Sequence, residues 1–324
     1  MTKAIVTMPI RRILFGTACA AALAAAMPLA GRAQVPAPSA ASAPTGEAEL
    51  QAAITKSNAY TALMNRTLRA IQSWERYASW VDMKKGPTGK ERYISYGLYS
   101  LYDVTGEIRK AEEAAARDPK LPEIDATVLG YIKAYQELAP LITRAERYYD
   151  RKDYRDDDLA EGRSLHAQMV PAAKAFLDQR AKLDAEMRVY KTALDAQELA
   201  AIAQREGKSV RWVVRNVMIN ARAVIDLMPS NEKPVVDLKA FDAAVANYAK
   251  AIREMDDFKD ANPGKSLFVD SQASSWLGKL RDFSAKLAKS KGDVRRGAAN
   301  DANWIVSSYN TMITLSETAI RFPR

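Results

Sequence analysis

The chain has 324 residues, with 48 basic and 39 acidic side chains but only one histidine and one cysteine. One histidine and one cysteine exclude a multi-histidine zinc site and an intramolecular disulfide. The basic and acidic residues are interleaved, which argues against a nucleic-acid-binding protein, in which cations gather in a stripe.

The first 33 residues predict a secretory signal peptide. Lys3, Arg11 and Arg12 form a positive start, an apolar run covers 13–30, and small residues around Ala33 end it. This order of segments is typical of a cleaved signal. We therefore expect a periplasmic or secreted protein that is cleaved near Ala33. The paired arginines leave general and twin-arginine export both open.

Two other fates of this segment stay open. Retention of the apolar run 13–30 would make it a membrane anchor. Acylation of Cys19 would make the chain a lipoprotein, but Gly16 stands where such a signal needs a bulky aliphatic residue, which argues against lipid anchoring. The following stretch, 34–48, is rich in Pro, Ala and Ser and predicts a flexible tether.

From residue 49 to residue 324 apolar residues recur at helical spacing, and no segment alternates as a strand would. The predicted helices cover about 47–83, 91–117, 122–149, 209–225, 236–258, 270–289 and 293–320. The longest predicted helix follows the polar connection 150–158, has its apolar face from Leu165 onward and runs to about Glu206. We expect an all-α protein, an elongated bundle of about seven or eight long, antiparallel helices kinked at Pro140 and Pro171. It forms one domain, 49–324, with room for a subdivision near 155–160.

The apolar positions also predict which helix faces are buried. The first helix has a stripe of Ile54, Thr61, Met64, Leu68, Ile71, Ala78 and Val81. The second has Ile94, Leu98, Leu101, Thr105 and Ile108. The helix that starts near Ser209 has Val210, Val213, Val214, Val217, Met218, Ala221, Val224 and Ile225.

The densest acidic segment, 150–161, is the candidate metal site. Its Asp153, Asp156 and Asp157, together with His166, are ligand types that bind cations. The order of residues does not match a calcium loop, and basic residues are interleaved with the acids. A solvated connection that places acids at a helix N-terminus is therefore the preferred interpretation, with His166 as a surface or packing residue.

Two further groups are candidate ligand-binding residues. Arg211, Arg215 and Arg222 share one helix face and could bind an anion, although a solvated face accounts for them more simply. Tyr96 and Tyr99 point away from the predicted core of the helix over 91–117. An aromatic binding surface is one explanation for them, and a central helix that is buried on most sides is the other.

No sequence pattern indicates an enzyme. A glycine-rich phosphate loop is missing, and nothing near His166 resembles a nucleophile elbow. We expect no catalytic residues and no cofactor.

The chain resembles the YiiG-like family of bacterial envelope proteins, whose domain has no known function. The resemblance rests on Lys56-Ser-Asn-Ala-Tyr60 with Asn65, on the block from Tyr148 to His166, and on Tyr309-Asn310. It covers about 49–320 and implies an exported helical domain, often a lipoprotein. It implies no activity and carries over no catalytic residue.

We therefore expect a non-enzymatic binding or scaffold module of the cell envelope. Its partner would be an envelope protein or an anionic envelope polymer rather than a nucleic acid, and a homo-oligomer stays open. The mature chain would lack a transmembrane helix. The alternative function is a metal-dependent binder or enzyme that uses residues 150–161 with His166.

Overall fold

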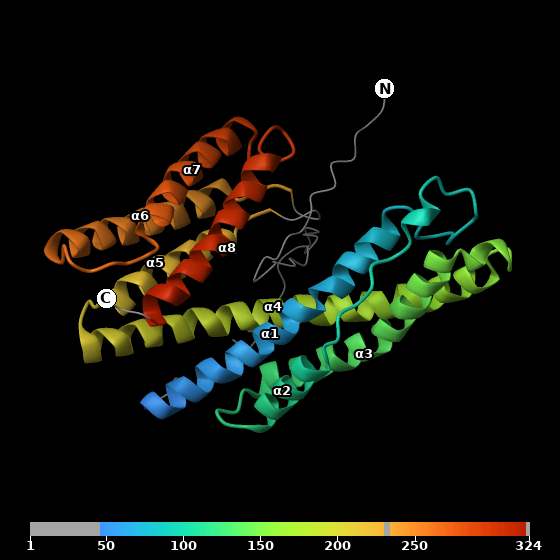
Figure 1. Ribbon diagram of the computed structural model, residues 1–324, viewed down its shortest axis with the longest axis horizontal. Helices are drawn as coiled ribbons and strands as arrows, with labels where there is room; N and C mark the ends of the chain where they lie inside the picture. Colours follow the sequence, from blue (N-terminus) through green and yellow to red (C-terminus); the bar gives the residue numbers. More distant parts are fainter. Residues whose placement is uncertain (1–45, 230–233, 322–324) are drawn as a thin grey trace, which may run out of the picture. The chain divides into compact units, whose positions relative to one another are not determined.

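The computed structural model describes residues 46–229 and 234–321, and every regular element in these two ranges is helical (Figure 1). The helices are α1 (Glu47–Ala78), η1 (Ile94–Tyr96), α2 (Thr105–Ala116), α3 (Pro122–Arg151), η2 (Asp153–Arg155), α4 (Ala160–Glu206), α5 (Val210–Ile225), α6 (Leu238–Ala261), α7 (Asp270–Lys289) and α8 (Ala299–Arg321). The predicted all-α helical bundle is confirmed. The predicted signal, including Cys19, and the tether up to residue 45 lie outside the described residues.

None of the described helices combines the length and the apolar character that crossing a membrane requires. The chain divides into two compact units between Lys191 and Thr192, inside α4. Residues 155–160, where the sequence leaves room for a subdivision, comprise the end of η2, the turn after it and the first residue of α4.

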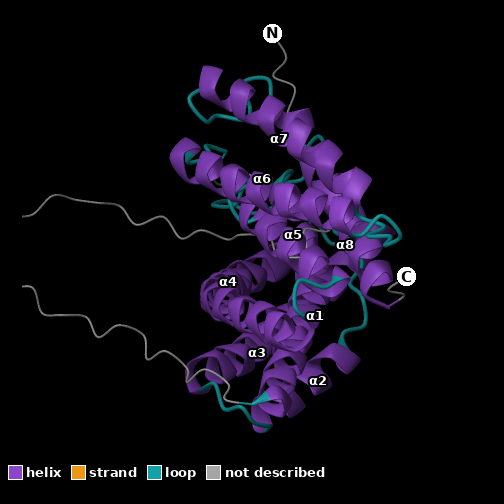
Figure 2. Cartoon of the chain, turned by 90° about the vertical axis from the view of Figure 1, so that its left-hand side faces the viewer, coloured by secondary structure: helices purple, strands orange, loops and turns teal. Residues whose placement is uncertain are grey.

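The first unit, residues 46–191, is built on α1, α3 and the first part of α4, with α2 packed against α1 and α3 (Figure 2). Its core is unusually aromatic. The largest fully buried side chains in it are Tyr60, Tyr77, Tyr131, Tyr148, Tyr149 and Phe176. Tyr131 stacks on Phe176, with ring centroids 5.1 Å apart. Such rings bury a large area and prefer defined mutual angles, which favours a single packing arrangement.

The buried face of α1 differs from the predicted stripe. Of the predicted residues within α1 only Met64 is buried. The observed face consists of Ala53, Lys56, Ser57, Tyr60, Leu63, Met64, Thr67, Ala70, Ser73 and Tyr77. The prediction was wrong because four of these positions carry polar side chains, which an apolar pattern assigns to the surface.

One of these polar side chains belongs to a buried ion pair between α1 and α3. The Lys56 ammonium lies 3.0 Å from both carboxylate oxygens of Asp125, and the Tyr60 hydroxyl donates to Oδ1 at 2.5 Å. The backbone N–H of Leu121 donates to Oδ2 at 2.9 Å. Burial and the Asp125 carboxylate raise the pKa of Tyr60, so this hydroxyl keeps its proton. The cluster thereby ties the first half of α1 to the start of α3.

A second buried polar cluster joins α1, α3 and α4. The Arg180 side chain is 3% exposed, and its Nε donates to Asp184 at 2.9 Å. Its Nη1 donates to the Met64 carbonyl oxygen at 2.7 Å and to the Tyr131 hydroxyl at 3.2 Å. One guanidinium group thus connects three helices at the centre of the unit.

The second unit, residues 192–321, has its core between α5, α6, α7 and α8. The predicted valine stripe of α5 is confirmed, because all eight of its residues are buried. Ser209 caps α5 as predicted, with its Oγ accepting from the Trp212 N–H at 3.3 Å. Trp276 is fully buried, and its indole N–H donates to the Ile305 carbonyl oxygen at 3.0 Å. The indole thus connects α7 to α8.

Two predicted helices begin later than expected. The last helix starts at Ala299, because Gly292 (φ +86°) turns the chain and its N–H and C=O bond to Leu287 and Val236. The helix predicted over 91–117 is helical only as η1 and α2. Gly97 has φ +53° and ψ −140°, a conformation that only glycine adopts easily. The chain therefore leaves the helical conformation at Gly97, directly after η1.

Candidate functional site

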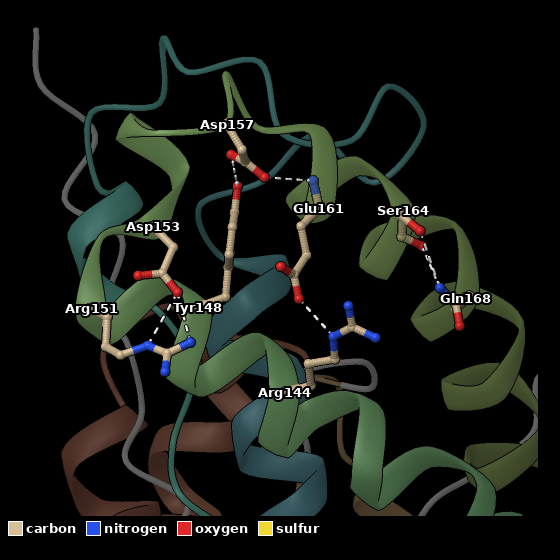
Figure 3. Close-up of polar contacts among 8 residues, drawn as sticks. All are labelled: Arg144, Tyr148, Arg151, Asp153, Asp157, Glu161, Ser164 and Gln168. Carbon is tan, nitrogen blue, oxygen red and sulfur yellow. Dashed lines mark hydrogen bonds and ion pairs between the residues drawn. The ribbon is translucent and has the colours of Figure 1, made fainter.

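The acidic segment forms the turn between α3 and α4 (Figure 3). Lys152 ends α3 in the left-handed conformation, with φ +64°, and η2 follows. The Asp157 carboxylate accepts from the Tyr148 hydroxyl at 2.7 Å, the Leu159 N–H at 3.0 Å and the Glu161 N–H at 2.8 Å. It therefore caps the start of α4, whose first N–H groups lack helical partners.

Hydrogen bonds, led by that from the Glu161 N–H, hold the pKa of Asp157 below its usual value. Two other acids of this segment are engaged with arginines. Asp153 pairs with Arg151 at 2.7 Å, and Glu161 with Arg144 at 2.6 Å (Figure 3). These contacts agree with a connection that supplies acids to a helix N-terminus.

The four metal-ligand candidates are not brought together. Asp153 and Asp157 have the partners given above, and Asp156 lies exposed in the turn. Within the described ranges no three side chains of ligand type converge on a point that could hold a metal ion.

His166 lies in an aromatic cluster. Its Nδ1 is 2.9 Å from the Tyr77 hydroxyl, and Gly86 is so close that a Cβ there would lie 3.1 Å from the imidazole ring. Trp80 contacts both Tyr77 and Tyr149 edge to face, with centroids 5.1 and 5.0 Å apart. Burial lowers the pKa of His166 and favours the neutral ring. The histidine thus packs the loop after α1 against α4.

We expect Gly162→Ala to lower the free energy of unfolding by about 1–3 kcal/mol, the usual cost of overpacking a core. A Cβ at this position would lie 2.9 Å from the Tyr149 hydroxyl oxygen and 3.0 Å from a Tyr148 ring carbon. The matched control is Gly278→Ala in α7, where no atom lies within 4 Å. The control should stabilise by about 0.5–1 kcal/mol through helix propensity. Chemical denaturation measures both, and equal effects of the two substitutions would contradict the prediction.

The arginine candidates of α5 are bound within their own unit. Arg215 lies 2.8 Å from Asp195 and 2.6 Å from Glu198, and Arg222 also pairs with Asp195. Arg211 lies 3.5 Å from Glu206. Carboxylates of α4 thus already pair with the three arginines that the sequence suggests as an anion-binding site.

Of the tyrosine candidates, Tyr96 is the last residue of the short helix η1, and Tyr99 lies in the non-helical segment that follows it. Residues 97–104, which we call the strap, run back along α1 toward α2 (Figure 1). Side chains of α1 replace the missing helical hydrogen bonds. Arg66 donates from Nε to the carbonyl oxygen of Asp103 at 3.0 Å, and Arg69 to that of Ser100 at 3.1 Å. The strap is therefore held by α1 side chains instead of by its own backbone.

The same contacts continue toward the end of α1. The Ser73 hydroxyl donates to the Tyr99 carbonyl oxygen at 3.0 Å and accepts from the Tyr99 N–H at 3.1 Å. Arg76 donates from Nε to the carbonyl oxygen of Tyr96 at 2.7 Å, and the Trp80 indole donates to that of Gly97 at 3.0 Å. The backbone from Tyr96 to Asp103 is thus fastened to one face of α1.

Arginine and tyrosine side chains alternate along this face. Tyr99 lies between two guanidinium groups, 4.1 Å from Arg69 and 4.2 Å from Arg76. Tyr102 likewise lies 4.6 Å from the Arg66 guanidinium and 5.5 Å from that of Arg69. These distances are typical of cation–π contacts.

The row continues beyond Arg76, whose guanidinium lies 5.6 Å from the Tyr96 ring. Tyr96 stacks on Tyr93 at 4.9 Å, and Arg92 lies 5.3 Å from Tyr93. We call this row the arginine–tyrosine ladder; its members are Arg66, Tyr102, Arg69, Tyr99, Arg76, Tyr96, Tyr93 and Arg92.

The ladder is exposed and carries excess positive charge. Tyr93, Tyr96 and Tyr102 are 41%, 49% and 50% exposed. Residues 66–104 contain seven basic and four acidic residues, a net charge of +3. Among the described residues, no carboxylate forms an ion pair with any of the four ladder arginines, whereas Arg109 and Arg144 in the same unit each have one.

The strap itself contains one acid, Asp103. Its carboxylate accepts from the N–H and the hydroxyl of Thr105, which hold its pKa below the usual value. The sequence indicated Tyr96 and Tyr99 but missed the four arginines and the other two tyrosines. Because the apolar pattern assigned 91–117 to one helix, it did not show that the tyrosines of this segment lie against the arginines of α1.

Comparison with known proteins places most of the chain in one group. Residues 51–313 match the model of a protein family of unknown function, DUF3829. The chain is 28% identical over 282 residues to the uncharacterized protein YiiG of Escherichia coli K12, covering 80% of this chain and 76% of YiiG. No solved structure matches the chain.

Proposed function

The chain belongs to the DUF3829 family of unknown function, and we propose that it is an exported, non-enzymatic binding module of the bacterial cell envelope. The arginine–tyrosine ladder is its binding surface. The observation that carries the proposal is the contrast between this ladder and the other charged groups. Arg109, Arg144 and Arg151 of the same unit have carboxylate partners, whereas the four ladder arginines lie beside tyrosine rings, three of which are exposed.

The remaining polar groups support a binding module rather than an enzyme. Asp157 caps α4, and His166 is packed against Tyr77. Arg215 and Arg222 share the carboxylate of Asp195. A metal-dependent activity of the acidic turn is not part of the proposal, because Arg151 and the N-terminus of α4 already engage Asp153 and Asp157. What stays accessible is a surface suited to recognition.

Export is the part of the proposal that rests on residues 1–33. A mass measurement on the protein purified from its own cells, combined with fractionation, tests it. We expect the protein in the periplasmic fraction with the mass of residues 34–324. A cytoplasmic protein of full mass would contradict export. A protein that retains Cys19 and carries additional mass on it would show that the chain is lipid-anchored.

Binding is tested by sedimentation of the purified chain with isolated envelopes of the same bacterium. The variant Arg69→Gln with Arg76→Gln removes two ladder charges and keeps an amide donor for the strap. The control Arg109→Gln with Arg117→Gln removes one charge from α2 and one from the residue that follows it, and both arginines contact Glu113. We expect the wild type and the control to sediment and the ladder variant to stay in solution. Equal sedimentation of all three would exclude the ladder as the binding surface.

A further inference from the structure

We infer that the ligand of the ladder is an acidic polysaccharide that lies lengthwise along α1 and the strap. This inference rests on the proposed binding function and names its ligand class. Arg66, Arg69 and Arg76 follow one face of α1 and span about 15 Å at 1.5 Å per residue. The tyrosine pair and Arg92 extend the row further. Cations spaced along a line match a polymer with repeated anions better than one small anion.

The guanidinium groups have the chemistry for carboxylate or phosphate groups on such a chain. The Nε groups of Arg66 and Arg76 donate to the carbonyl oxygens of Asp103 and Tyr96, so these bonds leave the two terminal nitrogens of each arginine for other acceptors. A planar guanidinium group binds an oxyanion with two parallel hydrogen bonds. The strap therefore fixes the arginines in place while part of each fork remains usable.

The tyrosines favour a sugar chain over a nucleic acid. Nucleobases bind proteins by stacking on open aromatic faces. The guanidinium groups of Arg69 and Arg76 already lie over the Tyr99 ring, and the Tyr96 ring already contacts Tyr93 and Arg76. Ring edges and hydroxyl groups remain, and tyrosine hydroxyls both donate and accept hydrogen bonds, as sugar hydroxyls do.

The ladder also lacks the features of a membrane-binding face. A segment that inserts into a lipid surface presents bulky aliphatic or tryptophan side chains beside its cations. Among residues 66–104 the large apolar side chains that are exposed are Tyr93, Tyr96 and Tyr102. Each of these rings contacts a guanidinium group instead of presenting a free apolar face.

Calorimetric titration of the purified chain with polygalacturonate tests the inference. Digalacturonate and neutral dextran test the need for length and charge. We expect polygalacturonate to bind, about tenfold or more tightly than digalacturonate, with an affinity that falls as salt screens the charges. Arg69→Gln with Arg76→Gln should weaken binding about tenfold, while Arg109→Gln with Arg117→Gln changes it less than about twofold.

Arg92→Gln provides a second variant, because the contact of Arg92 is to a tyrosine ring rather than to the strap backbone. It should weaken binding in the same direction without a change in melting temperature. Equal affinity of the wild type and both ladder variants would overturn the inference. So would tighter binding of oligothymidylate or of phosphatidylglycerol vesicles than of polygalacturonate.

The failure of this inference can be separated from failure of the proposed function. If no acidic glycan binds but sedimentation with envelopes still depends on Arg69 and Arg76, the ligand class is wrong and the binding function stands. If neither glycans nor envelopes bind, both are wrong.

Discussion

Replacing Arg180 by methionine is expected to lower the free energy of unfolding by about 3–5 kcal/mol, the range for breaking a buried ion pair from one side. The Arg180 and Asp184 side chains are 3% and 4% exposed. Methionine fills much of the volume but leaves the Asp184 carboxylate without its guanidinium partner. It also removes the donor to the Met64 carbonyl oxygen and the Tyr131 hydroxyl. Buried acceptors that lose a partner keep the full cost of their desolvation.

The same helix offers a matched control for this prediction. Lys174 and Asp178 have the same spacing in α4 as Arg180 and Asp184 but are 76% and 62% exposed. Lys174→Met should change the free energy of unfolding by less than about 0.5 kcal/mol, as is usual for an exposed pair. Urea unfolding followed by circular dichroism measures both variants. A loss below about 1 kcal/mol for Arg180→Met would show that the buried cluster is not a main source of stability.

Replacing Asp125 by asparagine should lower the free energy of unfolding by about 3–5 kcal/mol, because the Lys56 ammonium would stay buried without a counter-charge. The Lys56 side chain is only 2% exposed. Asparagine keeps an oxygen for the Leu121 N–H, and its NH2 group then faces the Tyr60 hydroxyl, which can rotate to accept. The loss of charge is therefore the main change. The effect therefore isolates the cost of an unpaired buried cation.

A rescue experiment separates this cause from a general disturbance of the core. Lys56→Met combined with Asp125→Asn removes both charges and keeps the amide acceptor. We expect the double variant to recover most of the stability that Asp125→Asn loses, since a buried pair is often replaced by apolar groups at little cost. Urea unfolding compares the wild type and the two variants. A double variant as unstable as the single one would refute the electrostatic explanation.

The second unit shows where sequence reasoning succeeds. In α5 the apolar stripe, Ser209 before it and Gly207 before the serine all predict the same helix start. The structure has this helix, its serine cap and all eight buried side chains of the stripe. Valine and isoleucine at helical spacing have no competing polar role to confuse the pattern.

The strap shows where it fails. Ile94, Leu98 and Leu101 have helical spacing, yet residues 97–104 form no helix. Their backbone partners are arginine and serine side chains of α1, some 20 to 40 residues earlier in the chain. A periodic pattern reports only neighbours in sequence, so it cannot register a partner supplied by another element.

The same limit explains the buried face of α1 and the candidate sites. Lys56 is buried because it forms an ion pair with Asp125 of α3, and Arg215 is neutralised because it forms an ion pair with Asp195 of α4. No property of the individual residues tells which charge finds a partner.

The amino-acid sequence by itself determined the all-α class, most helix boundaries and the family resemblance, because helix periodicity, caps and breakers act over a few residues. Only the tertiary structure decided which charged groups are paired and which remain accessible. That outcome depends on contacts between distant segments, and these contacts create the arginine–tyrosine ladder, which joins side chains from α1 with those of the loop and strap that follow it.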